Sequence, residues 1–242
     1  MTDRQKVPWA RLGVESVAIV ASILIAFAID TWWDDREDRE HERIYLESLR
    51  QEFTDGLAAA ASSEELRHVT VAAHESLVAQ IQGARRAPDG DLYTWISLAS
   101  YPIQYNPPRA VFNDLVASGG TLLIRSDELR LALARFDQEL VYLKDVDDTT
   151  WAVWGQRIQP FLEGRIPRVE RLRQGFAATR TDLPFGQSPH KPDFDGVLAD
   201  PRFEDMLAER WLRLQNGLVS MQRLSVFATE IIKLIDVELE QQ

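Results

Sequence analysis

The segment Leu12–Trp33, LGVESVAIVASILIAFAIDTWW, decides the architecture of this chain. Between Glu15 and Asp30 it holds fourteen consecutive uncharged residues, and eight of these are Val, Ile, Leu or Phe. A run of this length suits a buried core helix, the apolar part of a signal peptide, or a short membrane span. The residues on either side of the run favour one of these three.

Tryptophans stand at both ends of the segment. Trp9 precedes the run, and Trp32 and Trp33 close it, which is typical of the aromatic residues that anchor a helix at the two membrane interfaces. About 34 Å of helix separates Trp9 from Trp32, enough to reach both interfaces. The sequence therefore predicts a transmembrane helix over residues 12–33, with these three tryptophans as interface anchors.

The orientation of this helix depends on the basic residues around it. Three basic residues precede the segment and three follow it within ten positions, so their numbers tie: Arg4, Lys6 and Arg11 before, and Arg36, Arg39 and Arg43 after. The α-amino group tips the balance toward an N-terminus in the cytoplasm. We expect residues 1–11 to form a short cytoplasmic tail in the inner (cytoplasmic) membrane, and residues 34–242 to form a periplasmic or other extracytoplasmic domain.

A cleaved signal peptide is the main alternative to a permanent anchor. Ala26-Phe27-Ala28 fits the small-x-small pattern before a cleavage site, and the basic N-terminus fits the start of a signal peptide. Glu15 within the apolar region and the Trp pair directly after the proposed cut argue against cleavage. A secreted helical protein is the outcome if cleavage does occur.

One stripe of the predicted span has the residue types of a helix–helix contact. Glu15, Ala18, Ser22, Ala26 and Asp30 share a face, and the central three form a small-xxx-small repeat that lets two helices approach closely in lipid. The two carboxylates lie about 22 Å apart along the axis, less than the roughly 30 Å of a hydrocarbon core. We expect this face to pack against another membrane helix, in a homo-oligomer or a separate subunit. The alternative is that Ala and Ser are simply common there and the carboxylates mark the helix ends.

Composition narrows the possible functions. The 242 residues include 27 Lys and Arg against 38 Asp and Glu, a net charge of −11, and almost all of this excess lies after the apolar segment. Nucleic-acid binding depends on clustered cations, so we expect no nucleic-acid partner. Because the chain has no cysteine, disulfides, thiolate metal sites and a cysteine nucleophile are excluded.

Beyond the span, apolar residues recur at intervals of three and four, the spacing of amphipathic helices, and no run alternates as a strand does. The first such pattern predicts one long helix, or two with a break near Ser62-Ser63. Its apolar positions are Leu46, Leu49, Phe53, Leu57 and Ala60, followed by Leu66, Val69, Ala73, Leu77 and Ile81.

Capping residues mark the later helices. A helix over Arg109–Ser118 should end at Gly119, and Ser126 should cap a helix that continues to Pro160. Asp200-Pro201 should start the last helix. We therefore predict an all-α fold: one N-terminal transmembrane helix, then an antiparallel bundle of about four long helices with shorter connecting helices and an irregular connection over about 164–200.

Residues with catalytic or metal-binding chemistry are sparse. Glu65-x-x-His68 is half of a di-iron motif without its second copy, so an exposed histidine is the better interpretation. Asp145–Asp148 and Asp193–Gly196 lack the ligand spacing of a calcium loop. Trp151 and Trp154 could line a pocket, but core packing is the better interpretation. We predict no catalytic residue, no metal site and no cofactor.

The order of these segments resembles a bacterial family of uncharacterised, N-terminally membrane-anchored helical proteins, described as a domain of unknown function. The chain departs from the family's pattern in its span, where Ala28 and Asp30 stand in place of amides. The resemblance implies an uncleaved anchor and no known activity. It is carried by Glu15, Ser22–Phe27, Asp30–Trp33, Arg36, Tyr45-Leu46, Leu49 and Glu52, by Ala110–Gly119, Leu122–Ile124, Ser126, Glu128–Arg130 and Leu133, and by Asp200–Phe203.

Two classes of function fit these observations. The first is a single-pass anchored helical protein without enzymatic activity, which binds another protein or serves as an accessory subunit of an envelope complex. The second is an extracytoplasmic sensor of a small molecule. A tail of eleven residues cannot form an output domain, so such a sensor would signal through a partner.

Overall fold

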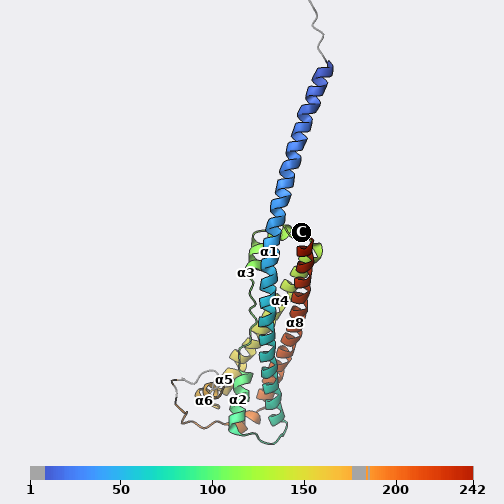
Figure 1. The fold of residues 1–242 in the computed structure, drawn as a ribbon. Helices are drawn as coiled ribbons and strands as arrows, with labels where there is room; N and C mark the ends of the chain where they lie inside the picture. The colour runs from blue at the N-terminus through green and yellow to red at the C-terminus, as the bar shows by residue number, and fades with distance from the viewer. Residues whose placement is uncertain (1–8, 176–183, 185, 242) are drawn as a thin grey trace, which may run out of the picture.

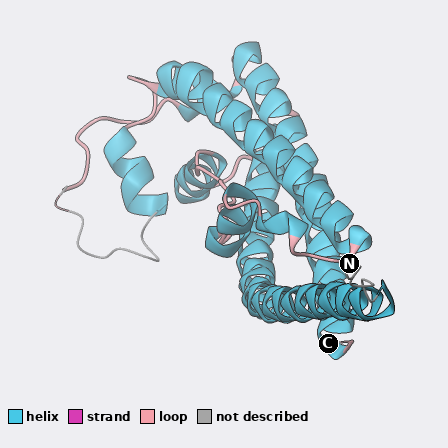
Figure 2. Cartoon of the chain, turned by 90° about the horizontal axis from the view of Figure 1, so that it is seen from above, coloured by secondary structure: helices cyan, strands magenta, loops and turns pink. Residues whose placement is uncertain are grey.

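The computed structural model describes residues 9–175, 184 and 186–241. Within these ranges every regular element is a helix and no strand is present, as Figure 2 shows from above. The predicted all-α class is therefore confirmed.

The first helix, α1, is the longest element and runs from Trp9 to Ile81 without a break at Ser62-Ser63. Its 73 residues extend over about 110 Å. Figure 1 shows its first part standing clear of the other helices and its second part lying among them. From Glu42 to Leu77, buried residues recur at intervals of three and four, because this part has helices packed along one side.

Two further long helices complete the bundle. Helix α4 (Asp127–Val153) begins where the Ser126 hydroxyl accepts a hydrogen bond from the Leu129 amide. It continues through a π-helical turn, η2 (Trp154–Ile158), into α5 (Gln159–Leu162). Helix α8 (Pro201–Glu240) begins where Asp200 accepts from the Arg202 amide. Both predicted caps are confirmed.

The directions of the long helices differ from the predicted antiparallel arrangement. Phe53 contacts Phe136 and Arg67 contacts Asp147, so residue numbers rise together and α1 is parallel to α4. Helix α8 runs opposite to both, since Arg50 of α1 pairs with Asp236 while Glu75 of α1 lies beside Trp211. The described chain thus has three long bundle helices in place of about four.

The connection between α1 and α4 explains this difference. It holds α2 (Asp89–Ala99), then an extended stretch that returns along the bundle, where the Tyr105 hydroxyl donates to the Gly56 carbonyl at 3.0 Å. Next come α3 (Ala110–Ala117), Gly119 in the left-handed conformation, and the short η1 (Gly120–Leu122). The extended return lets the chain come back along the bundle without a long helix, so α4 can start beside the same end of α1 and run parallel to it.

The predicted irregular connection over 164–200 contains two short helices, α6 (Arg168–Gly175) and α7 (Phe194–Leu198). Asp193 caps α7 by accepting from the Gly196 amide at 2.9 Å, so the predicted turn at Asp195-Gly196 is helical. Helix α6 packs against α2 at the end of the bundle far from the start of α1 (Figure 1).

The bundle has two main apolar cores separated along its length. The proximal core, nearer the start of α1, includes Leu46, Leu49, Phe53, Leu129, Leu133, Phe136, Leu224, Ile231 and Ile235. The distal core includes Leu77, Leu92, Ile96, Trp154, Ile158, Phe194, Phe203 and Leu207. Between them lie a small apolar cluster and a set of buried polar side chains.

Candidate functional site

The first candidate site is the exposed half of α1, which we define as residues 19–41. Every residue in this range is exposed. Its large apolar side chains are 49–65% accessible, values foreign to a folded core: Ile19, Val20, Ile23, Leu24, Ile25, Phe27, Ile29, Trp32 and Trp33. A contiguous apolar surface of this kind marks a contact with another protein or with lipid.

The structure describes part of the predicted helix-packing face. Ser22, Ala26 and Asp30 are exposed and follow one another every four residues along an unbroken helix, so they share one side. The side chains of Glu15 and Ala18 lie outside the described residues.

Two of the three predicted interface anchors are described. Trp32 and Trp33 are both exposed, with their rings edge to face at 5.3 Å, and the Arg36 guanidinium lies 5.9 Å from the Trp32 ring. The side chain of Trp9 lies outside the described residues. Among the residues that the structure describes, no helix combines the length and apolar character needed to cross a membrane.

The exposed half of α1 ends at a set of polar contacts with the segment around α3. Glu42 is buried and accepts from the Arg125 amide at 2.8 Å, while Asp35 lies 3.6 Å from the Arg125 guanidinium. Further along, Glu52 accepts from the Val111 and Phe112 amides at the start of α3. These carboxylates fix the chain beside α1 at the point where the helix enters the bundle.

The second candidate site is the buried polar layer between the two cores, which we define as Arg67, Thr70, His74, Asp147, Thr150, Arg210 and Ser220. At its centre the Arg67 guanidinium forms two contacts of 2.8 Å with the two carboxylate oxygens of Asp147. Both side chains are almost wholly buried. A paired charge of this kind is strongly destabilising to break, because the remaining partner is left buried without a counter-charge.

Two neighbouring residues complete the setting of this ion pair. The Tyr105 amide donates to Asp147 at 3.2 Å, which ties the extended return to α4. Gly217 of α8 leaves the space for Arg67, because a Cβ there would lie 2.6 Å from a guanidinium nitrogen. The pair thus fixes the lengthwise position of α1 against α4, with α8 closing over it.

His74 belongs to the same buried layer and is wholly buried. Its Nδ1 donates to the Thr70 carbonyl at 2.8 Å, since a carbonyl can only accept. Burial and the positive charge of Arg210 lower the pKa of His74 to about 4, so the ring is neutral at neutral pH.

Arg210 is the least compensated group in the layer. Its guanidinium donates to the carbonyls of Ala99 and Tyr101 and lies 5.5 Å from the centre of the Trp154 ring. Within the described part of the chain no carboxylate forms an ion pair with it, and burial lowers its pKa to about 9. Arg171 of α6 also faces Trp154, at 5.9 Å, so two cations share one indole ring.

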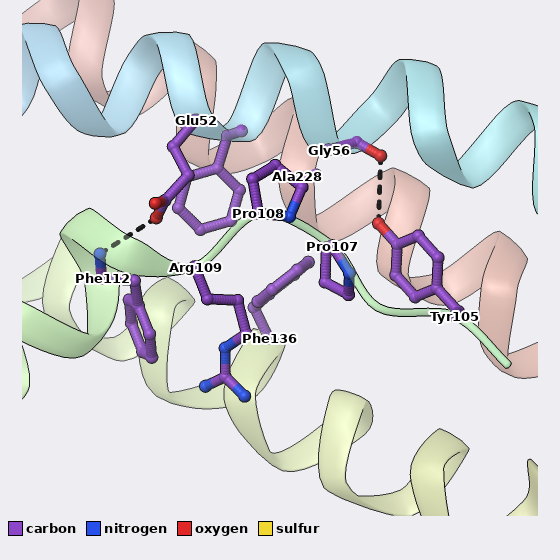
Figure 3. A pocket seen from close by; sticks show the side chains of 10 residues that line it. Glu52, Gly56, Tyr105, Pro107, Pro108, Arg109, Phe112, Phe136 and Ala228 are labelled. Atoms are coloured by element: carbon purple, nitrogen blue, oxygen red, sulfur yellow. Dashed lines mark hydrogen bonds between the residues drawn. The ribbon is translucent and has the colours of Figure 1, made fainter.

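A small cavity lies where the extended return passes α1, and Figure 3 shows its lining. At one side Glu52 accepts from the Phe112 amide, and at the other the Tyr105 hydroxyl donates to the Gly56 carbonyl. Pro107, Pro108 and Phe136 line the cavity between them. Its volume is about 10 Å³, room for about one water molecule. Burial raises the pKa of Tyr105 to about 12, so this hydroxyl is a hydrogen-bonding group and not a base at neutral pH.

Two segments that contain possible metal ligands come together in the structure. Glu65–His68 and Asp145–Asp148 lie side by side, but their contact is the Arg67–Asp147 ion pair. His68 is exposed, as expected. Trp154 is buried while Trp151 is exposed, so the two do not line a common pocket. Within the described residues no group of His, Asp and Glu side chains could hold a metal ion.

Sequence reasoning missed the buried polar layer, although a signal for it exists. Counting in sevens from Leu46 gives Phe53, Ala60, Arg67 and His74, and all five are buried. Because the last two of these positions hold polar residues, this buried stripe does not appear in the sequence as a continuous apolar pattern. Leu66 and Val69, which were expected to continue it, are half-buried and exposed respectively.

Comparison of the chain with models of protein families, with curated proteins and with solved structures finds no match. Membership of the membrane-anchored family that the sequence resembles therefore stays a prediction.

Proposed function

We propose that this protein is a single-pass membrane protein of the inner membrane whose helical domain acts in protein–protein interaction, as an accessory subunit of an envelope complex, and not in catalysis. Residues 12–33 form the anchor, the N-terminus lies in the cytoplasm, and residues 34–242 form the extracytoplasmic domain. The packing face of the anchor contacts another membrane helix.

One observation supports this proposal above the others. The apolar side chains from Ile19 to Trp33 are exposed around the whole helix, whereas after Glu42 the apolar side chains gather on the side that faces α4 and α8. A helix that is apolar all round requires an apolar environment on every side. Lipid supplies this, and the Trp pair and the charged residues that follow are suited to the membrane surface.

The unbroken path of α1 suits a role in assembly. The same helix forms the predicted anchor and one wall of the bundle, so the position of the bundle relative to the membrane is set by a rod and not by a flexible linker. Carboxylates at Glu42 and Glu52 hold the segment around α3 against this rod. The domain would therefore present fixed surfaces to a neighbouring protein at a set distance from the membrane.

Fractionation of cells that express the full chain tests the anchor. The chain is expected in the membrane fraction and should resist extraction at high pH. Leu24→Arg together with Ile23→Arg should weaken this retention strongly, because each arginine costs about 2.5–3.5 kcal/mol at the centre of a membrane helix. Val141→Arg, at an exposed apolar position on α4, is the matched control and should stay in the membrane. Release of the unmodified chain at high pH would contradict the anchor.

The mass of the isolated chain separates the anchor from a cleaved signal peptide. The proposal requires a protein that retains residues 1–33 when purified from membranes. A mature chain that begins just after Ala28 would establish the secreted alternative and contradict the proposal.

A further inference from the structure

Helix α8 has a second apolar stripe on the side that faces away from the bundle. Its inner side contributes buried residues to all three apolar clusters, as expected of a bundle helix. On the outer side, Leu212, Val219 and Val226 are 57%, 49% and 63% exposed. Single exposed apolar residues are ordinary on a protein surface, but these three recur every seven residues and therefore form one line along the helix.

Charged residues continue this line by one step at each end. Asp205 stands seven residues before Leu212, and Lys233 stands seven residues after Val226. Both are exposed, and within the described part of the chain neither forms an ion pair. We call these five residues the outer line of α8. Along the helix it has a negative end, an apolar middle and a positive end.

Two copies of the outer line are complementary when they run in opposite directions. Asp205 of each copy then lies against Lys233 of the other. Leu212 lies against Val226, and Val219 lies against its own equivalent. A parallel pair would instead oppose Asp205 with Asp205 and Lys233 with Lys233, and like charges at such positions are destabilising.

We propose that the protein forms a two-fold dimer through the outer line, with the two α8 helices antiparallel. The two-fold axis passes beside Val219, so both copies use the same surface and the assembly closes at two chains. From Asp205 to Lys233 the paired lines extend over about 42 Å of helix. A spacing of seven residues suits two helices that wind gently around each other.

The residues on either side of the outer line are compatible with this pairing. On the side nearer α1, where Trp211 meets Glu75, the flanking residues are uncharged: Ala208, Gln215, Gln222 and Thr229.

The side nearer α4 has charged residues, and most of these have partners within their own chain. Arg223 lies 3.9 Å from a glutamate of α4, and Glu209 contacts two arginines. Glu230 comes level with Glu209 of the other copy, where those two arginines offset the like charge. No uncompensated repulsion therefore opposes the contact along α8.

In such a pair the exposed halves of α1 point in opposite directions. Helix α1 runs opposite to α8 and continues past its end as a single rod (Figure 1). The contact goes beyond the proposed function and does not depend on it. If residues 12–33 lie in lipid, the pair joins chains from two membranes that face each other, and neighbours in one membrane do not form it.

Single cysteines test the direction of the pair, since the chain has no cysteine of its own. In the full chain, extracted in mild detergent, Val219→Cys should form a disulfide-linked dimer on mild oxidation. Leu212→Cys and Val226→Cys should each crosslink poorly alone, because about 21 Å of helix separates each thiol from its own equivalent. A mixture of these two variants should crosslink well. A strong crosslink of Leu212→Cys with itself would establish a parallel pair and overturn the inference, as would a Val219→Cys chain that does not crosslink.

Charge reversal tests the ends of the outer line, with the rate of disulfide formation by Val219→Cys as the readout in every chain. Asp205→Lys and Lys233→Asp should each slow this rate about tenfold, because each sets like charges against each other at both ends of the pair. The two changes together in one chain should restore the rate, because the inverted line is still complementary to an antiparallel copy. A combined variant that is as slow as the single ones would overturn the inference.

Matched controls separate this contact from a general effect on the chain. Val226→Glu should almost abolish the crosslink at position 219, whereas Val141→Glu, at an equally exposed valine of α4, should leave it unchanged. Circular dichroism should show the same helix content in both variants. Chains that form this crosslink but are absent from the membrane fraction contradict the anchor and support the dimer.

Discussion

The two halves of α1 belong to one unbroken helix, yet they meet entirely different surroundings. From Glu42 onward the helix buries one stripe of side chains against α4, α8 and the extended return. Over residues 19–41 every side chain is exposed, including Leu24 and Phe27, which are more than 60% accessible. The helix thus continues unbroken past the point, near Glu42, where the other helices of the bundle begin to pack against it.

The two halves differ in where their apolar side chains lie on the helix and in what covers them. In the bundle half, apolar side chains occupy the face that other helices cover, so the chain itself satisfies them. In the exposed half they occur on every side, and the described chain offers nothing to cover them. The predictions below test whether the two halves differ in this way.

The largest expected effect belongs to the buried ion pair in the bundle half. Asp147→Ala should lower the free energy of unfolding by about 3–5 kcal/mol, because it leaves the Arg67 charge buried and unpaired. Chemical denaturation in mild detergent measures this. Asp148→Ala, next in sequence but half exposed, is the control and should change it by less than about 0.5 kcal/mol. Equal effects would show that the pair does not hold the bundle.

Truncation of one leucine in each half compares them directly. Leu49→Ala should cost about 2–5 kcal/mol, because the side chain is wholly buried in the proximal core. Leu24→Ala should leave the free energy of unfolding of the bundle unchanged within about 0.5 kcal/mol. If Leu24→Ala destabilised the bundle as much as Leu49→Ala does, residues 19–41 would have to pack within the chain, against the present account.

Acid should weaken the bundle half through His74. The pKa of this residue is about 4 in the folded protein and about 6.5 when unfolded. Between these values the unfolded chain binds more protons, so the free energy of unfolding falls as pH falls from about 6.5 to about 4 and is full above 6.5. The contribution amounts to about 3 kcal/mol.

Denaturation curves across this pH range measure the effect of His74. His74→Gln should remove the corresponding slope, whereas His68→Gln, at an exposed site on the same helix, should keep it. Identical slopes in the two variants would disprove the role of His74.

The smallest expected effect concerns a helix cap. Ser126→Ala should cost about 1 kcal/mol, since the hydroxyl that accepts from the Leu129 amide is lost at the start of α4. Ser22→Ala, in the exposed half, should not alter unfolding of the bundle. Thermal or chemical unfolding of both variants would reveal whether a serine in the exposed half affects the bundle as the cap does.

Residues that act on their sequence neighbours allowed much of the fold to be predicted. Contacts between residues far apart in the sequence could not be predicted. Ser126, Asp200 and Gly119 act on their own neighbours, so their positions were sufficient to place helix ends. The parallel direction of α1 and α4 follows from the extended return at Tyr105, whose hydrogen bonds to Gly56 and Asp147 join segments far apart in sequence.

The two candidate sites also differ in whether the sequence alone predicts them. The exposed apolar half of α1 was predictable, because its run of apolar residues is visible in the sequence alone. The buried polar layer was not, because Arg67 and His74 resemble surface residues until Asp147 and Gly217 are brought beside them. Arg67 and His74 can be assigned to the buried stripe of α1 only if polar residues are counted as part of an apolar pattern.

Labelling of single cysteines in native membranes tests most directly whether residues 19–33 lie in lipid. Because the chain has no cysteine, Leu24→Cys, Asp38→Cys and Val141→Cys each introduce one thiol at an exposed position. A water-soluble maleimide should react with the cysteines at 38 and 141 in opened membranes, and with the one at 24 only after detergent is added. Labelling at position 24 as fast as at position 38 without detergent would contradict the account.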